Sequence, residues 1–233
     1  MWNTAANPFM KLTRKRYCLR PETARTLLHA ERFARAAGTP LNLFVTIKFA
    51  LPSRSGKPAH KLFSQYIWGN TRRRWMAMSK RRRSSVPFTA IAVFENPLKR
   101  KTGNRHLYGP YHVHWMLHWD LHEVSKFKYH IRKHMRKRFH KFKNSHLRII
   151  EVWDSVKCVK YMAKGIDAPF ADHFYLKHSP QGPIHHRRIM TTRSIGTKAR
   201  KNAPASWRRP RPSYRGSRTL NRRSGSANFG RVP

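Results

Sequence analysis

Two segments of the chain alternate apolar and polar residues with a period of two, which constrains each of them to be a half-buried β-strand. In residues 41–49 the apolar face consists of Leu41, Leu43, Val45, Ile47 and Phe49. In residues 110–120 the apolar face consists of Val113, Trp115, Leu117 and Trp119, and the other of His112, His114, Met116 and His118. The apolar faces must bury against a core, so the histidine face is left for another role.

The rest of the pattern predicts an α+β fold. Further strands are predicted at 86–95 and 147–153, and helices at about 21–38, 59–83, 121–142 and 154–165. Residues 96–109 read as a basic, glycine-containing connection. This order favours an antiparallel sheet of about five strands with helices packed on one face and basic, flexible termini.

Positive charge dominates the composition, with 51 Lys and Arg against 9 Asp and Glu, a formal net charge of +42. Self-repulsion at this density indicates a polyanionic partner, namely nucleic acid. The aromatic fraction of 12% is too high for a wholly disordered chain, so part of it should bury a core. We predict a basic N-terminal extension with a helix at 1–39, one domain at 40–196 and a basic disordered tail at 197–233.

The two cysteines, Cys18 and Cys158, exclude a disulfide scaffold and a four-cysteine zinc site. They suit a reducing compartment. The sequence has no apolar run of the length that a signal peptide or a membrane span needs. The sequence therefore predicts a soluble, cytoplasmic protein with no membrane partner.

A metal site is the first chemical prediction. His112 and His114 project from the same face of one strand, although about one His-x-His pair is expected by chance in a chain with 15 histidines. Glu95 ends the preceding strand and would complete a three-ligand site for Mn²⁺ or Mg²⁺, with Zn²⁺ still open. Alternatively, Glu95 only pairs with a cation. Glu151 is the reserve carboxylate, and His118 is expected to be a neighbour of the site and not a ligand.

A second candidate pair lies on the predicted helix at 154–165. Tyr161 and Lys164 are one turn apart, on the face opposite the apolar stripe. A phenol beside an ammonium can serve as a nucleophile, because the cation favours the phenolate and can hold a phosphate. The alternative is a solvated basic face, since the same spacing recurs at Tyr129 and Arg132.

The order of these features resembles the HUH endonuclease superfamily, specifically its single-tyrosine rolling-circle replication initiators. The resemblance covers about residues 41–165 and consists of the strand at 42–48, a carboxylate strand, His112-Val113-His114, and Tyr161 and Lys164 on a following helix. It implies that His112, His114 and Glu95 bind a divalent metal, that Tyr161 attacks a phosphodiester of single-stranded DNA, and that Lys164 orients it. The products would be a 5′-phosphotyrosine and a free 3′-OH.

The resemblance also implies partners: single-stranded DNA or an origin hairpin, in a bacterial host whose replicon is a phage or a plasmid. The sequence has no phosphate-binding loop of a helicase motor, so a host helicase and polymerase would be needed. Two alternatives remain, a non-catalytic basic nucleic-acid-binding protein and an HUH transposase or relaxase. The aromatic candidates for stacking on unpaired bases are Trp68, Trp75, Trp207 and Tyr214.

Overall fold

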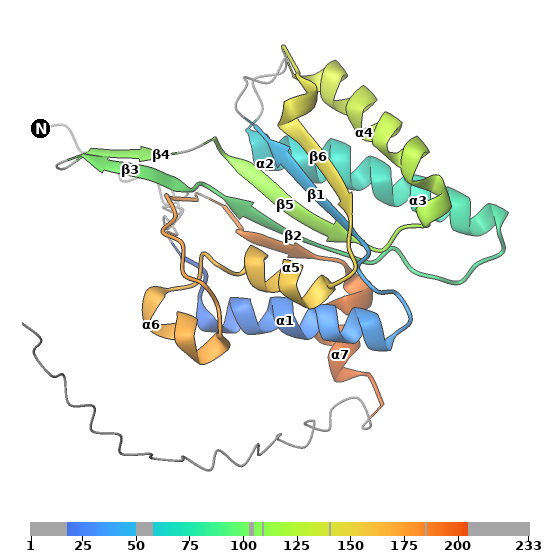
Figure 1. Ribbon diagram of the computed structural model, residues 1–233. Helices are drawn as coiled ribbons and strands as arrows, with labels where there is room; N and C mark the ends of the chain where they lie inside the picture. The colour runs from blue at the N-terminus through green and yellow to red at the C-terminus, as the bar shows by residue number, and fades with distance from the viewer. Residues whose placement is uncertain are drawn as a thin grey trace, which may run out of the picture. The chain divides into compact units, whose positions relative to one another are not determined.

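A computed structural model describes residues 18–49, 58–102, 105–108, 110–139, 141–184 and 186–204 (Figure 1). The chain divides into two units, Met1–Ala203 and Pro204–Pro233. All of the helices and strands below belong to the first unit. The predicted tail lies outside the described residues from residue 205 onward.

The centre of the first unit is an antiparallel sheet of five strands in the order β6-β1-β5-β2-β7. The strands are β1 (Leu43–Lys48), β2 (Ala90–Glu95), β5 (His112–Leu117), β6 (Leu147–Glu151) and β7 (Ile189–Thr191). The predicted α+β class and the sheet of about five antiparallel strands are confirmed. The histidine strand, β5, is the central strand of this sheet.

One face of the sheet is covered by two long helical segments (Figure 1). The first runs without a break through α2 (Ala59–Leu62), a π-helical stretch (Phe63–Trp68) and α3 (Gly69–Arg81). The second is a 3₁₀ turn (Leu121–Glu123) followed by α4 (Val124–Arg138). The predicted apolar faces of β1 and β5 pack against these helices, with Trp115 and Trp119 fully buried between them.

The opposite face of the sheet is also covered by helices. The sheet therefore has a helical layer on each face, where the sequence predicted helices on one face only. Here α1 (Pro21–Ala36) and α5 (Ser155–Met162) pack together and on Phe44, Val93 and Met116. The small residues of α1, which the sequence assigned to an extension, are buried in this second core. The shorter elements are α6 (Ala168–Ala171), α7 (Thr197–Lys201), which begins in the predicted tail, and 3₁₀ turns at Asn144–His146, Asp172–Phe174 and Arg193–Ile195.

The segment predicted as a connection, residues 96–109, contains a two-stranded hairpin of β3 (Leu98–Thr102) and β4 (Arg105–Tyr108). Its sequence is rich in cations and lacks an alternating apolar face, so it gave no strand pattern. No helix within the described ranges is long and apolar enough to cross a membrane.

Candidate metal centre

The register of the sheet brings the predicted metal ligands together. Glu95 on β2 lies directly across from His112 on β5, and Thr46 on β1 lies across from His114. Cross-strand partners point to the same face of a sheet, so all four side chains project toward the layer of α1 and α5. A shift of one residue in either strand pair would send one partner to the other face.

Three ligand atoms of these side chains converge on one point. His112 Nε2 lies 3.1 Å from His114 Nε2 and 3.2 Å from Glu95 Oε2, and His114 Nε2 lies 3.4 Å from the same oxygen. Ligands bonded to one metal ion at about 2.1 Å, at angles between octahedral and tetrahedral, lie roughly 3.0 to 3.4 Å apart. The spacing of the three atoms therefore fits a bound divalent ion, and Glu95, His112 and His114 form the one potential metal-binding group among the described residues.

The outer nitrogens of both imidazoles are held by neighbours. His112 Nδ1 lies 2.9 Å from the carbonyl oxygen of Pro110, which can only accept, so this nitrogen carries the proton and Nε2 keeps its lone pair. His114 Nδ1 lies 3.0 Å from the hydroxyl of Thr46, which can accept its proton in the same way. Hydrogen bonds of this kind fix the ring orientation of metal-binding histidines. Burial lowers the pKa of His114, which keeps this imidazole neutral and able to bind a cation.

Glu95 is 1% exposed and has unequal carboxylate oxygens. Burial would raise its pKa, but the imidazoles of His112 and His114 beside Oε2 and the charge of Lys164 outweigh burial and hold the pKa well below its ordinary value. Lys164 Nζ lies 2.9 Å from Oε2, which also faces both histidines. Oε1 is buried and has no hydrogen-bond partner among the described residues. A buried carboxylate oxygen without a hydrogen-bond partner destabilises the folded protein, and a cation beside it would offset this loss of stability.

Tyr161 reaches the same place from α5. Its ring centroid lies 5.1 Å from that of His114, and Lys164 Nζ sits 3.6 Å from the centroid of the Tyr161 ring. Phe44 stacks on the His114 ring at a centroid distance of 5.2 Å and also contacts the Tyr161 ring at 6.2 Å. Tyr161 is 50% exposed, so it lies at the rim of the metal group, by which we mean Glu95, His112 and His114, and is open to solvent.

The helix that carries Tyr161 is fixed at both ends. The carboxylate of Asp154 accepts a hydrogen bond from Lys157 N at 3.0 Å and caps the N-terminus of α5. At the other end, Ser179 N donates to Lys164 O at 2.8 Å. The buried residues Val159 and Met162 anchor the inner face of α5 in the core.

A pocket of about 580 Å³ opens beside Tyr161 and Lys164. Its other walls are Lys160, Lys177, His178, Ser179 and Pro180. No carboxylate is among these lining residues, so the pocket presents cations and a phenol next to the metal group. This combination suits an anionic ligand such as a phosphodiester.

The remaining sequence predictions have mixed outcomes. Glu151 is exposed on the edge strand β6, away from the ligand group. His118 lies just beyond β5, bonds the Pro40 carbonyl and contacts Trp75 of α3, so it lies outside the ligand group. Of the proposed stacking residues, Trp75 is buried, which removes it as a platform for unpaired bases. Trp68 packs on Trp115. Trp207 and Tyr214 lie outside the described residues.

Sequence reasoning missed several residues of this region. Thr46 and Phe44 position His114 from the neighbouring strand, and only the cross-strand register reveals them. Lys177 enters the pocket from a loop with no recognisable pattern.

Comparisons of the chain with protein-family models, with curated proteins and with solved structures gave no match. The chemistry available is set by the groups already described. Three ligands on one side of an ion leave coordination positions open for a substrate oxygen. The Tyr161 ring and the Lys164 ammonium lie beside this ligand group, and a phenol next to an ammonium is a combination that can serve in nucleophilic attack on a phosphate.

Proposed function

We propose that this protein is an endonuclease and strand transferase that nicks and rejoins single-stranded DNA, with Tyr161 as the nucleophile. The observation that carries the proposal is the convergence of two strands and one helix on a single site. The ligand atoms of Glu95, His112 and His114 lie 3.1 to 3.4 Å apart, and the Tyr161 ring contacts His114. The cationic pocket next to this site supports a phosphodiester as the substrate.

In this proposal Glu95, His112 and His114 hold Mn²⁺ or Mg²⁺. When bound, the ion supplies a Lewis acid for a non-bridging oxygen of the scissile phosphate. Lys164 has two tasks. Its ammonium holds the Tyr161 ring through a cation–π contact, and it offers a hydrogen bond to a phosphate oxygen when it leaves Glu95.

The reaction is a transesterification. The Tyr161 oxygen attacks phosphorus, the bond between phosphorus and the 3′-oxygen breaks, and the proton lost by the phenol is balanced by the proton gained by the 3′-oxygen. The products are a 5′-phosphotyrosine and a free 3′-OH. The reverse attack by a 3′-OH restores Tyr161 and rejoins the strand, so no nucleotide cofactor is consumed.

The biological setting that we propose is initiation of rolling-circle replication of a phage or plasmid in the cytoplasm of a bacterial host. The free 3′-OH would prime a host polymerase. The sequence contains no phosphate-binding loop of a helicase, so a host helicase would separate the strands. A single-stranded origin or an origin hairpin is the partner that fits this scheme.

The test is covalent capture of labelled single-stranded oligonucleotides in the presence of Mn²⁺, read on a denaturing gel. The wild-type protein should form an adduct that Tyr161→Phe and His112→Ala abolish. Tyr129→Phe is the matched control, because Tyr129 is also an exposed tyrosine with a cation three residues later. An adduct that survives Tyr161→Phe would contradict the role of Tyr161 as the nucleophile. No adduct across a library of origin-like oligonucleotides would leave only a DNA-coating protein.

A further inference from the structure

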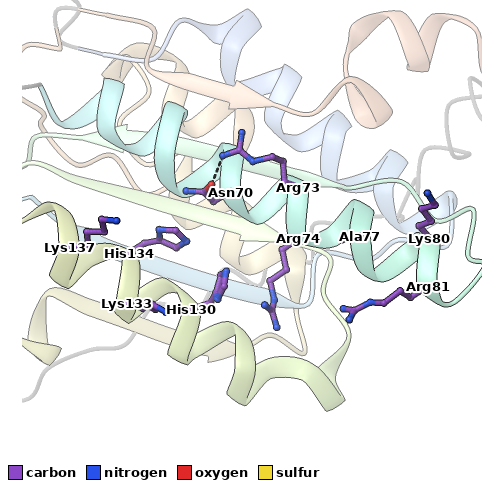
Figure 2. A pocket seen from close by; sticks show the side chains of 10 residues that line it. All are labelled: Asn70, Arg73, Arg74, Ala77, Lys80, Arg81, His130, Lys133, His134 and Lys137. Atoms are coloured by element: carbon purple, nitrogen blue, oxygen red, sulfur yellow. Dashed lines mark hydrogen bonds between the residues drawn. The ribbon is translucent and has the colours of Figure 1, made fainter.

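A second basic surface lies between α3 and α4, over the sheet face opposite the metal group (Figure 1). A groove of about 800 Å³ runs between the two helices. Figure 2 shows Arg74 and Arg81 reaching from α3 toward α4, with His130 and His134 in the space between. The lining residues are Asn70, Arg73, Arg74, Ala77, Lys80, Arg81, His130, Lys133, His134 and Lys137.

The lining of the groove concentrates positive charge. Six of its ten lining residues are lysine or arginine, two more are histidine, and none carries a carboxylate. Burial lowers the pKa of His130 and His134, and neighbouring cations, among them Lys133, lower it further. Such a field disfavours the free protein through self-repulsion and favours a bound polyanion.

The charges also match the repeat of a phosphate backbone. Arg74 and Arg81 are seven residues apart on one helix, a distance of about 10 Å at 1.5 Å per residue. One strand of a duplex passes roughly three phosphates over that length. Lys133 and Lys137 supply a second row of cations from the facing helix. A backbone lying in the groove therefore meets cations on both sides.

The lining favours a duplex over a single strand. Proteins that hold single strands add aromatic platforms for unpaired bases to their basic grooves. No phenylalanine, tyrosine or tryptophan lines this groove. We propose that the α3–α4 groove binds the phosphate backbone of a nucleic-acid duplex, independently of its base sequence. This inference does not depend on the nuclease proposed above, because it concerns the other helical layer.

The experiment compares two pairs of substitutions in the full chain. The groove pair is Arg81→Gln with Lys133→Gln, and the control pair is Arg25→Gln with Lys198→Gln on α1 and α7. All four side chains are exposed, and each pair removes one arginine and one lysine. Binding of a random-sequence DNA duplex, the same duplex in RNA and the single DNA strand is measured by fluorescence anisotropy across a salt series, and thermal unfolding confirms folding.

We expect the groove pair to weaken duplex DNA binding at least tenfold and to reduce the slope of log affinity against log salt by about 2, since each phosphate contact contributes about 0.9. The control pair should change affinity less than about threefold. Restoring charge with Arg81→Lys and Lys133→Arg should restore binding. Equal losses in both pairs, or a loss confined to the single strand, would overturn the inference. A loss confined to the RNA duplex would assign the groove to RNA.

The same variants separate this inference from the proposed function. The groove pair should form the covalent adduct with a short single-stranded oligonucleotide at the wild-type rate. If no protein forms an adduct while the groove pair still loses duplex binding, the nuclease proposal fails and the duplex groove stands. If the adduct forms and duplex binding is unchanged in the groove pair, the nuclease proposal stands and the duplex groove fails.

Discussion

Among single residues, Glu95 is the one that contacts both histidines of the site and Lys164. One of its oxygens faces His112, His114 and Lys164, and the carboxylate is almost fully buried. Its position could be predicted from the sequence, because it ends the strand before the histidines in a chain with few acids. The contact with Lys164 could not, since it depends on how the turn after α5 lies over the sheet.

Metal binding should depend on Glu95, His112 and His114 and not on His118, the next histidine along the chain. We expect Glu95→Gln and His112→Ala to lower Mn²⁺ affinity at least tenfold, because each removes one of three ligands. His118→Ala is the matched control, since His118 directly follows β5 but bonds Pro40 and contacts Trp75. Isothermal titration with Mn²⁺ measures all three, and an equal loss in His118→Ala would refute the assignment of ligands.

Lys164 should stabilise the metal-free protein. Lys164→Met leaves the buried Glu95 carboxylate without its ammonium, which we expect to cost about 3 kcal/mol of unfolding free energy. Added Mn²⁺ should recover more stability in this variant than in the wild type, because the ion takes over the charge balance. Urea unfolding with and without Mn²⁺ is the measurement. Lys160→Met, in the same pocket, is the control, and an equal response in both variants would contradict the role of Lys164.

At the scale of elements, the sequence predicted the long patterned segments and missed the short or highly charged ones. Period-two alternation identified β1 and β5 because one face of each is buried in a core. β7 has only three residues, and the β3–β4 hairpin has no apolar face, so neither produced a pattern. The helix α1 was predicted, but its packing on the sheet was not. Its buried face is mostly alanine, which gives only a weak amphipathic pattern in the sequence.

The short helix α5 depends on its cap. Asp154→Ala removes the side-chain acceptor for Lys157 N, and we expect the free energy of unfolding to fall. Adduct formation should slow as well, because α5 positions Tyr161. Asp154→Asn should retain both properties, since asparagine caps equally well. Denaturant unfolding and adduct kinetics are the readouts, and an unchanged Asp154→Ala protein would show that packing alone holds the helix.

At the scale of the whole molecule, histidines that stay neutral set the response to acid. The pKa is lowered from the ordinary 6.5 for His29, His60, His114, His130 and His134. The unfolded state therefore binds more protons, and unfolding free energy should fall as pH falls below about 6.5. The lowered pKa of Glu95 adds a contribution that is constant above about its ordinary 4.5.

We expect urea midpoints, measured with a chelator present, to fall steadily between about pH 7 and pH 5.5. The variant His130→Gln with His134→Gln should show a smaller fall, because two of the shifted groups are gone. A midpoint that stays constant or rises as the solution is acidified would contradict the neutral state of these histidines.

The central claim is that Tyr161 becomes joined to the 5′ side of a broken DNA strand. Tandem mass spectrometry of the trypsin-digested adduct tests it most directly, because cleavage after Lys160 and Lys164 releases residues 161–164 as one short peptide. We predict that this peptide carries the nucleotide on the tyrosine through a 5′-phosphate and that the released strand ends in a 3′-OH. A nucleotide on any other residue, or a tyrosine joined through a 3′-phosphate, would contradict the account.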